Sequence, residues 1–442
     1  MCSVFLTNKP VFDIEAVNRF IRLRGPDHTE VIQHEGLTFI HNLLSISGAF
    51  LVQPFESGDV TALFNGEIYN FDSFGSFSSD GECLIPAYKN LGSLFPQALD
   101  GEFAIVVVDM AARCVLLSTD VFATKPLHVA IDGPYFGIAS YESALAAAGF
   151  VNVVKVPANQ ILRIDLGAPS LVQIGQVYDF SLVQYRKDFD AWVESFELAV
   201  RKRAERCREK IFIGLSSGYD SGAISCALNK LRRPYNAYSV IGKENNEILK
   251  ERSATLNGDS IHRLIIPNDD VRSRARAYID SHVEPLFYKT YSSHGDYNEF
   301  ALKLHDDSGA TGLSMVCEAA VADGCKVYLS GQGADEIMSD YGFAGQRIYA
   351  HSNFGGLFPE KLSDIFPWPS FFGSSQESYL MKEEHVAGSY GIEARYPFLD
   401  RRVVQEFLAL DSRLKNSRYK SALRAYLENN SFPTAFDMKI GF

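Results

Sequence analysis

The sequence predicts two domains of different fold class: a β-rich α+β domain, then an α/β domain built on a parallel sheet. The length of 442 residues is typical of two or three domains. Short apolar runs separated by turn residues fill roughly the first 150 residues, and from about residue 189 strand-like runs alternate with helical ones. Such alternation requires crossover connections, and these produce parallel strands.

The first part is expected to be rich in strands because its apolar runs are short and end at glycine, serine or aspartate. The expected strands include residues 60–66 (VTALFNG), 103–110 (FAIVVVDM) and 114–120 (CVLLSTD). The pattern is interrupted between residues 165 and 190, so the predicted domains are residues 1–165 and residues 185–442.

In the second part, helical spacing over residues 189–210 precedes a strand, a polar turn and a helix in FIGLSSGYDSGAIS, residues 212–225. Small hydroxyl and glycine residues at a helix start suit an anion, because unpaired backbone N–H groups and the helix dipole favour negative charge there. Further elements follow in alternation: a strand at residues 236–242, a helix at 245–257, a strand at 261–267 and a strand-to-loop unit at 326–336.

The bulk composition excludes several classes of function. A formal net charge of −12 argues against general binding to nucleic acid or membrane surfaces. No apolar run reaches the length of a membrane-spanning helix, and MCSVFLTNKPVF lacks the basic and long apolar regions of a secretory signal. The 7 cysteines are scattered and form no C-x-x-C pair. A cytoplasmic enzyme fits these features best.

The first candidate for chemistry is Cys2, which follows the initiator methionine. Removal of Met1 would leave a thiol and an α-amine on one residue. An α-amine titrates near ~8, so it can take the thiol proton without a histidine. The alternative reading of Cys2, on position alone, is a small buried residue at the start of a strand.

Four motifs occur in order after Cys2: RGPD at 24–27, QPF at 53–55, NGEIYN at 65–70 and SDGE at 79–82. Together they resemble the class II (N-terminal nucleophile, Ntn) glutamine amidotransferase domain. The resemblance implies an αββα sandwich with Cys2 as nucleophile and an oxyanion hole made by Asn65 and Gly66. The residues that it implies for binding glutamine are Arg24, Glu67 and Asp80.

The sequence departs from this family at two positions. In HNLLSI, Leu43 stands where the family usually has an arginine that grips the glutamine carboxylate. Loss of that charge-assisted bond is worth ~1.5–3 kcal/mol. Ser3 replaces the usual glycine. Glutamine is therefore expected to bind weakly, through another group, or not at all.

The turn SSGYDSG resembles the SGGxDS pyrophosphate loop of the ATP pyrophosphatase group, whose domain is Rossmann-like. It lacks the Gly-Lys-Ser/Thr of a Walker loop, so it is expected to hold pyrophosphate as a leaving group. A serine-rich turn between strand and helix is the alternative. The residues implied for ATP and pyrophosphate are Leu215, Ser216, Ser217, Gly218, Asp220, Ser221, Val240, Ser330 and Gly331.

Two later stretches, LSGQGADEIMSDYG at 329–342 and IEARYPFLD at 392–400, resemble asparagine synthetases. The implied Mg²⁺ ligands are Asp220, Asp335 and Glu336, since hard oxygen donors suit that ion. Lys420, in RYKSALR, is expected in a helix as a catalytic residue that stabilises negative charge. The alternatives are a solvated surface lysine and, for Glu393 and Arg395, a structural ion pair. Gln332 replaces a common glutamate and cannot act as a base.

The resemblance extends from Cys2 to the terminal KIGF and implies an asparagine synthetase-like, glutamine-dependent amidotransferase. Its substrates would be glutamine, ATP with Mg²⁺, and a carboxylate acceptor, and its products glutamate, AMP, pyrophosphate and an amide. Aspartate is the default acceptor, although Ser308 replaces an arginine that helps to bind it. The alternatives are a uronic sugar, peptide or specialised metabolite as acceptor, an intramolecular amide-forming ligase, or a non-catalytic binding protein. A homodimer is also expected.

Overall fold

The computed structural model describes residues 2–242, 244–291 and 299–435. The terminal KIGF stretch lies outside these residues. The chain separates into two compact units. The N-terminal unit runs to Asp179 and includes residues 282–284 and 388–393, and the C-terminal unit contains residues 180–281, 285–387 and the chain from 394 onward.

The N-terminal unit contains two six-stranded sheets whose strand pairs are antiparallel. The first sheet has the order β10-β8-β9-β1-β3-β2. Its strands are β1 (Ser3–Thr7), β2 (His28–His34), β3 (Leu37–Leu43), β8 (His128–Asp132), β9 (Tyr135–Ala139) and β10 (Val153–Lys155). The second sheet has the order β12-β11-β7-β6-β5-β4. Its strands are β4 (Phe55–Ser57), β5 (Val60–Ile68), β6 (Gly101–Asp109), β7 (Cys114–Thr119), β11 (Gln160–Asp165) and β12 (Leu171–Gln176).

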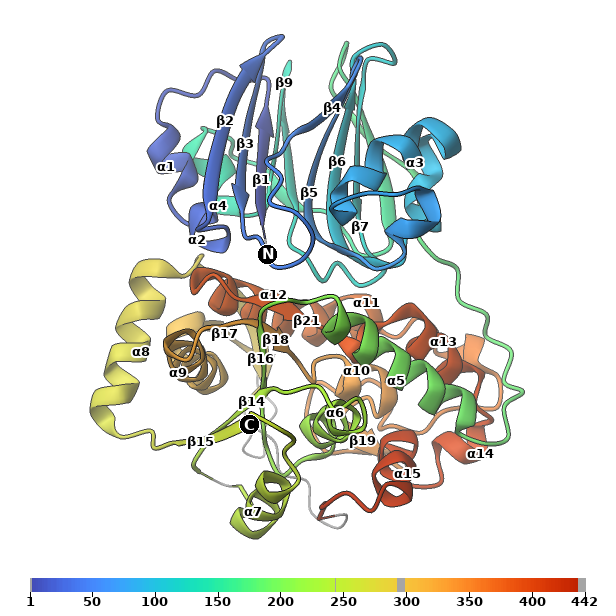
Figure 1. Ribbon diagram of the computed structural model, residues 1–442. Coiled ribbons are helices and arrows are strands. Elements are labelled where there is room, and N and C mark those ends of the chain that lie inside the picture. Colours follow the sequence, from blue (N-terminus) through green and yellow to red (C-terminus); the bar gives the residue numbers. More distant parts are fainter. Residues whose placement is uncertain (1, 243, 292–298, 436–442) are drawn as a thin grey trace. The chain divides into compact units, whose positions relative to one another are not determined.

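Helices cover the outer faces of both sheets (Figure 1). On the first sheet lie α1 (Ile14–Asn18), α2 (Ile21–Arg24) and α4 (Glu142–Ala147), and their side chains Val17, Ile21 and Ala144 pack against Phe5 and Ile40 of the strands. Helix α3 (Leu84–Leu91) lies against β4 and β5 of the second sheet. The layers are therefore helix, sheet, sheet and helix, which confirms the predicted αββα sandwich.

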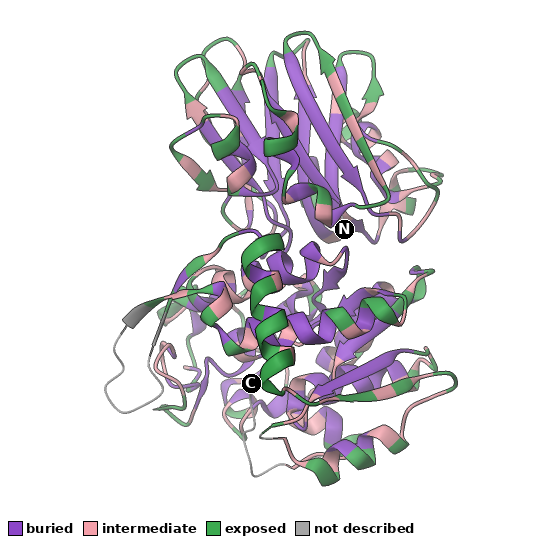
Figure 2. Cartoon of the chain, turned by 90° about the vertical axis from the view of Figure 1, so that its left-hand side faces the viewer, coloured by how far each residue is buried: buried purple, intermediate pink, exposed green. Residues whose placement is uncertain are grey.

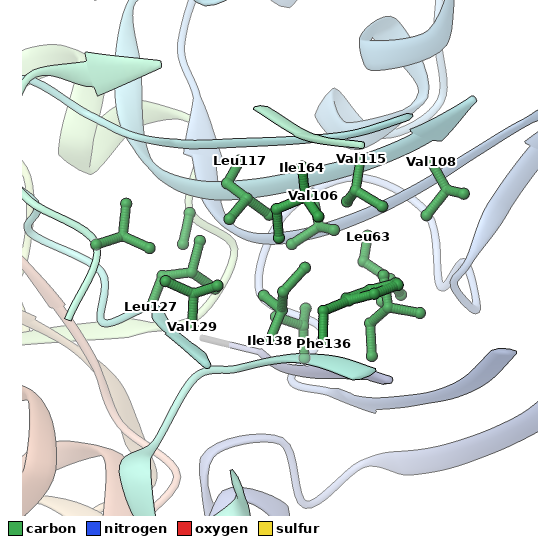
Figure 3. Packing of buried hydrophobic residues seen from close by; sticks show 14 of the residues in the cluster. Leu63, Val106, Val108, Val115, Leu117, Leu127, Val129, Phe136, Ile138 and Ile164 are labelled. Carbon is green, nitrogen blue, oxygen red and sulfur yellow. The ribbon is translucent and has the colours of Figure 1, made fainter. Parts of the chain in front are cut away.

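The main core of this unit fills the space between its two sheets (Figure 3). Side chains alternate between the faces of a strand, so alternate residues meet in this layer. Val4 and Leu6 of β1 and Leu37 and Phe39 of β3 face strand residues of the second sheet such as Val106. Burying each large aliphatic side chain contributes ~1.5–3 kcal/mol. Figure 2 shows the strands of this unit as largely buried. The same alternation places Cys2, His41 and Leu43 on the inner face.

The C-terminal unit is built on a five-stranded sheet with the order β15-β14-β13-β18-β21. Strand β13 pairs in parallel with β14 and β18, and β14 pairs in parallel with β15. This confirms the predicted α/β class. The strands are β13 (Lys210–Gly214), β14 (Asn236–Val240), β15 (Ile261–Ile265), β18 (Cys325–Leu329) and β21 (Glu393–Arg395). The chain runs outward from β13 in one direction and later resumes at β18 on the other side, so the loops after these two strands meet where ligands bind in open α/β sheets.

Helices connect these strands, and the helices predicted at residues 189–210, after the polar turn and at 245–257 are confirmed as α5, α6 and α7. Two short hairpins, β16–β17 (Phe287–Tyr291 and Glu299–Lys303) and β19–β20 (Gly342–Phe343 and Gln346–Arg347), were not predicted. The helices are α5 (Asp190–Glu205), α6 (Tyr219–Lys230), α7 (Asn246–Ala254), α8 (Asp269–His282), α9 (Ser308–Ala322), α10 (Ala334–Met338), α11 (Pro369–Phe372), α12 (Ser374–Ser389), α13 (Arg401–Ala409), α14 (Ser412–Lys415) and α15 (Ser421–Asn429).

Within the described residues, no helix combines the length and the apolar character that crossing a membrane requires.

Candidate active sites

Cys2 lies directly before β1, and its backbone is held by the second sheet. Its N atom donates a hydrogen bond to Asn65 Oδ1 at 3.0 Å, and its Sγ lies 4.0 Å from the carbonyl oxygen of Leu44. Burial raises the pKa of the Cys2 thiol to about 11. The thiol is therefore protonated at neutral pH, and a nucleophilic role requires a base beside it.

Asn65 lies on β5 and is fully buried. Its Oδ1 accepts from Cys2, whereas its Nδ2 is buried and has no hydrogen-bond partner among the described residues. A buried donor without a partner is rare and suggests a ligand. The neighbouring Gly66 has φ +136°, and a Cβ there would lie 1.9 Å from the carbonyl oxygen of Glu102. Only glycine fits, so the backbone at Gly66 is fixed next to the Asn65 donor.

Two carboxylates lie in the same region of the N-terminal unit. Glu67 Oε1 accepts a hydrogen bond from Ser47 Oγ at 2.7 Å, and Asp80 Oδ2 accepts one from the backbone N of Ile68 at 2.8 Å. Burial raises the pKa of Asp80 to about 6, because it outweighs the hydrogen bonds that lower this pKa. Asp80 also acts electrostatically on Cys2. The structure thus brings together Cys2, Asn65, Gly66, Glu67 and Asp80.

Arg24, predicted to bind glutamine, contacts Cys2 and Tyr141 in the structure. It is fully buried, and its Nε donates to the carbonyl oxygen of Cys2 at 3.2 Å. Its Nη1 donates to Tyr141 Oη at 2.7 Å, and the guanidinium lies over the Tyr141 ring. These contacts favour a role in positioning Cys2, in place of the predicted contact with glutamine.

The two departures from the family pattern have clear surroundings. Leu43 is buried at the end of β3, where it pairs with His28 of β2. Ser3 Oγ donates to the carbonyl oxygen of Ile21 at 2.7 Å and accepts from Asn42 Nδ2 at 2.9 Å. Both hydrogen-bonding capacities of the hydroxyl are used, which explains how serine is accommodated in a buried position.

The motif residues that were assigned no chemistry hold the loops around Cys2. Asp27 Oδ2 accepts from the backbone N of Ser45 at 2.8 Å, and Gln53 Oε1 accepts from the backbone N of Phe64 at 2.8 Å. Asn70 Oδ1 accepts from the backbone N of Asp100 at 2.8 Å. The spacing of the four motifs therefore reflects loop anchoring as well as chemistry.

In the C-terminal unit, the polar turn between β13 and α6 is closed by its own hydroxyl groups. Ser216 Oγ and Ser221 Oγ are 2.8 Å apart, and the backbone N of Gly218 donates to Ser216 Oγ at 3.2 Å. At the ends of β13 and β14 lie Leu215 and Val240, with the N of Leu215 bound to the carbonyl oxygen of Tyr238 at 2.8 Å. The turn opens at the N-terminus of the 12-residue helix α6, a position that favours anions.

Two residues that contact this turn were not predicted. Arg252 of α7 is fully buried and donates through Nη1 to the carbonyl oxygens of Ser216 and of Gly218, the latter at 2.9 Å. Glu244 Oε2 accepts from the backbone N of Ser217 at 2.6 Å and from Ser217 Oγ. The local sequence could not predict either contact, because Arg252 and Glu244 bind a turn that lies at least 27 positions earlier in the chain.

Lys420 joins the turn to the loop after β18. Its Nζ lies 2.6 Å and 2.8 Å from the two carboxylate oxygens of Asp220 and 3.0 Å from Asp335 Oδ1. Burial opposes the charge, but the carboxylates of Asp220 and Asp335 outweigh it and raise the pKa of Lys420 above its ordinary value. A buried cation thus bridges two carboxylates that are far apart in the sequence.

The prediction that Lys420 lies in a helix is wrong. Lys420 has φ 47° in the left-handed region and directly precedes α15. The sequence RYKSALR has ordinary helical propensity. The ion pairs of Lys420 with Asp220 and Asp335 outweigh this small preference for a helical backbone at Lys420. The lysine is also buried, not a solvated surface residue.

The loop after β18 lies close to Asp220, which follows the polar turn between β13 and α6. A Cβ on Gly331 would lie 2.9 Å from the Cβ of Asp220, so a larger residue would push the two loops apart. Ser330 Oγ donates to Glu383 Oε2 at 2.6 Å. Ser330 and Gly331 therefore lie beside Asp220, as the sequence predicts for one site.

Glu336 does not join Asp220 and Asp335. Its two oxygens accept from Gln332 Nε2 at 2.8 Å, from the backbone N of Gly333 at 3.2 Å and from Tyr341 Oη. Burial raises its pKa to about 7. These contacts cap the start of α10 and give Glu336 a structural role, and its role as a metal ligand stays a prediction.

Asp220 and Asp335 by themselves fit Mg²⁺, which proteins hold through one or two carboxylates plus substrate phosphates. Within the described residues, no group of three or more histidine, cysteine, aspartate or glutamate side chains is arranged to hold a metal ion. Arg395 is buried and its Nη1 donates to the carbonyl oxygen of Arg203 at 2.6 Å, so its contact there is structural.

Comparisons with known proteins match both parts of the chain. A family profile described as glutamine amidotransferase domain matches residues 1–165, and one described as asparagine synthase matches residues 191–377 and 370–436. The fold and the matches thus define an amidotransferase domain followed by a synthase domain. The chain belongs to the asparagine synthase family, whose profile covers more than half of it. The resemblance inferred from the motifs is confirmed.

The curated relatives are distant in sequence. A Methanocaldococcus jannaschii protein whose name describes a glutamine-hydrolysing asparagine synthetase is 26% identical over 424 residues, with 89% of this chain and 72% of the relative covered. The asparagine synthetases of Gallus gallus and Homo sapiens are 26% and 24% identical, each over 92% of this chain and over 76% and 77% of the relative.

Solved structures show partial likenesses. The phosphoribosylpyrophosphate amidotransferase of B. subtilis has a TM-score of 0.34 at 13% identity, with 75% of each chain covered. The NAD⁺ synthetase of Burkholderia pseudomallei has a TM-score of 0.22 at 14% identity, with 50% of this chain and 87% of that chain covered. With scores this low, the fold assignment rests on the sheet topology described above.

Proposed function

We propose that the protein is a glutamine-dependent and ATP-dependent amide ligase. It adenylates a carboxylate and aminates the product, with aspartate as the first acceptor to test. The observation that carries the proposal is the cluster of Lys420, Asp220 and Asp335 beside the polar turn. Three distant segments supply these charges, and a binding scaffold would have no need to bring them together around one buried lysine.

In the first half-reaction, which the predicted domain 1–165 would perform, Cys2 Sγ attacks the carboxamide of glutamine. The α-amine that is exposed by removal of Met1 takes the thiol proton, because burial keeps the thiol protonated in the resting state. The Asn65 Nδ2 donor is available for the oxygen that becomes negative. Ammonia leaves with a proton, and water then cleaves the thioester to glutamate.

In the second half-reaction, assigned to residues 185–442, the acceptor carboxylate attacks the α-phosphorus of ATP and pyrophosphate leaves. The turn residues Ser216, Ser217 and Ser221 would bind its oxygens. Asp220 and Asp335 would hold Mg²⁺, which neutralises charge on the leaving group. Lys420 would stay beside the adenylate. Ammonia then attacks the acyl carbon and AMP departs.

The acceptor is the least constrained part of the proposal. Ser308 is exposed at the start of α9, where it presents a hydroxyl instead of a guanidinium. The nearby cation Lys382 lies 3.1 Å from Asp307 Oδ2, so its charge is already matched within the protein. These contacts favour testing carboxylates other than aspartate, including uronic sugars and peptides.

The test measures AMP and pyrophosphate release with a panel of carboxylates, each with glutamine, with ammonium and with neither. Aspartate or another single carboxylate should support stoichiometric AMP, pyrophosphate and amide. Absence of AMP with every acceptor and both nitrogen donors would refute the ligase proposal. The cytoplasmic location and the homodimer stay predictions; the former fits the 7 free, buried cysteines.

A further inference from the structure

The end of β2 places a histidine on the face of the sheet that carries Cys2. In the β2–β3 register, Ile32 pairs with Phe39 and His28 pairs with Leu43. Ile32 and Phe39 both pack against the core between the sheets. Because side chains alternate and opposite residues share a face, His28 and Leu43 project to that same inner face.

His28 is also close enough to Cys2 to contact the same small ligand. Ser3 pairs with Asn42, so Cys2 adjoins Leu43, and His28 lies on the next strand. Two strand spacings separate backbones by ~10 Å. An extended glutamine spans roughly 5 Å from amide carbon to carboxylate carbon. The side chains of Cys2 and His28 can cover the remaining distance.

The loop that follows β3, residues 44–54, contacts His28. The loop is anchored at Glu67 by Ser47 Oγ, at 2.7 Å, and at the carbonyl oxygen of Ser78 by the backbone N of Ala49, at 2.9 Å. The next residue, Phe50, is 55% exposed, and its ring meets the His28 ring edge to face at 6.2 Å. His28 is therefore at the rim of the site that contains Glu67.

We propose that His28 binds the α-carboxylate of the amide donor, in place of the arginine that Leu43 replaces. This inference rests on the proposed function. Glu30 Oε2 lies 3.0 Å from His28 Nε2, so Nε2 carries a proton there, and the doubly protonated ring also donates from Nδ1 toward a ligand. The side chain of His28 is 37% exposed, whereas Arg24 is fully buried against Cys2 and Tyr141.

The first experiment compares glutaminase kinetics of the full chain with those of two variants. His28→Ala should raise the KM for glutamine roughly ten-fold with little change in kcat, the effect of losing one charge-assisted hydrogen bond. His34→Ala is the matched control, since His34 lies at the other, exposed end of the same strand. His28→Arg should keep the KM at or below the value of the natural protein.

The second experiment separates binding of the carboxylate from a structural effect. 4-Aminobutanamide is glutamine without its carboxylate, so His28→Ala should leave its kcat/KM unchanged. An unchanged KM for glutamine, or an equal loss with both donors, would overturn the inference.

A third measurement does not need turnover. Glutamine binding to Cys2→Ala protein should weaken roughly ten-fold when His28→Ala is added. If glutamine binding depends on His28 but the natural protein has no glutaminase activity, the inference is supported and the proposed function is refuted. Turnover with a His28-independent KM would refute the inference alone, and the absence of any glutamine binding would refute both.

Discussion

The two candidate sites differ in how their polar groups are satisfied without substrate. In the Cys2 site, the Nδ2 donor of Asn65 is buried and has no partner in the described part of the chain. In the second site, Lys420 is matched by Asp220 and Asp335, and Glu244 occupies the donors of Ser217. The first site contains a buried donor with no partner in the described residues, whereas in the second site one cation is paired with two carboxylates.

This difference implies two modes of substrate binding. An unmet donor in a rigid strand gains a partner as negative charge develops, with no rearrangement needed. In the proposed reaction, Lys420, Asp220 and Asp335 would exchange internal partners for phosphate oxygens and Mg²⁺ as the nucleotide binds. Variants of the second site should therefore have the larger effects, because each aspartate is both an ion-pair partner of Lys420 and a proposed ligand of Mg²⁺.

The largest expected effect is at the cluster of Lys420, Asp220 and Asp335. Asp220→Ala and Asp335→Ala should each abolish ATP–pyrophosphate exchange and leave glutaminase activity intact, because each removes a carboxylate proposed to hold Mg²⁺. Exchange of radiolabelled pyrophosphate measures this directly. Asp270→Ala, an exposed position at the start of α8, is the control. Near-normal exchange in either variant would remove that aspartate from the site.

The next effect concerns Cys2. Cys2→Ala should eliminate glutamine-driven synthesis and preserve ammonium-driven synthesis, since ammonia formation and amide formation use different residues. Amide yield with each nitrogen donor is the measurement, and Cys114→Ala, buried in β7, is the control. Equal loss of both activities in a folded Cys2→Ala protein would contradict two separate sites. Intact-mass analysis should also show that Met1 has been removed.

A smaller effect is expected at position 43. Leu43→Arg should lower the KM for glutamine of the His28→Ala protein by roughly ten- to a hundred-fold, because it restores one charge-assisted bond of ~1.5–3 kcal/mol. Ammonium-driven synthesis should not change. Because Leu43 is buried, thermal unfolding must accompany the kinetics. A stable variant with unchanged KM would mean that the carboxylate does not approach this strand end.

The smallest expected effect concerns Glu244, which accepts hydrogen bonds from Ser217. Glu244→Gln should tighten binding of inorganic pyrophosphate by roughly ten-fold, because the carboxylate no longer competes for the Ser217 donors. Calorimetric titration gives the affinity, and Glu247→Gln, exposed on α7, is the control. Weaker binding in Glu244→Gln would indicate that Glu244 supports the turn or a bound cation.

Local patterns predicted most of this fold, and long-range contacts account for what they missed. Alternating apolar residues identified strands such as β6, and small polar residues identified the turn before α6. The position of Lys420 outside a helix could not be predicted, because its partner Asp220 lies 200 positions away. The contact of Arg24 with Tyr141 could not be predicted either, since the two residues are 117 positions apart.

The hydroxyl of Ser3 makes two positions of the sequence interdependent. Asn42 Nδ2 donates both to Ser3 Oγ and to Asn18 Oδ1, at 2.9 Å and 2.8 Å, in a fully buried setting. Changing Ser3 to glycine alone would orphan one of those two N–H groups, at a cost of ~1–3 kcal/mol. Positions 3 and 42 therefore form one epistatic unit: a glycine next to the nucleophile becomes acceptable only when the asparagine changes with it.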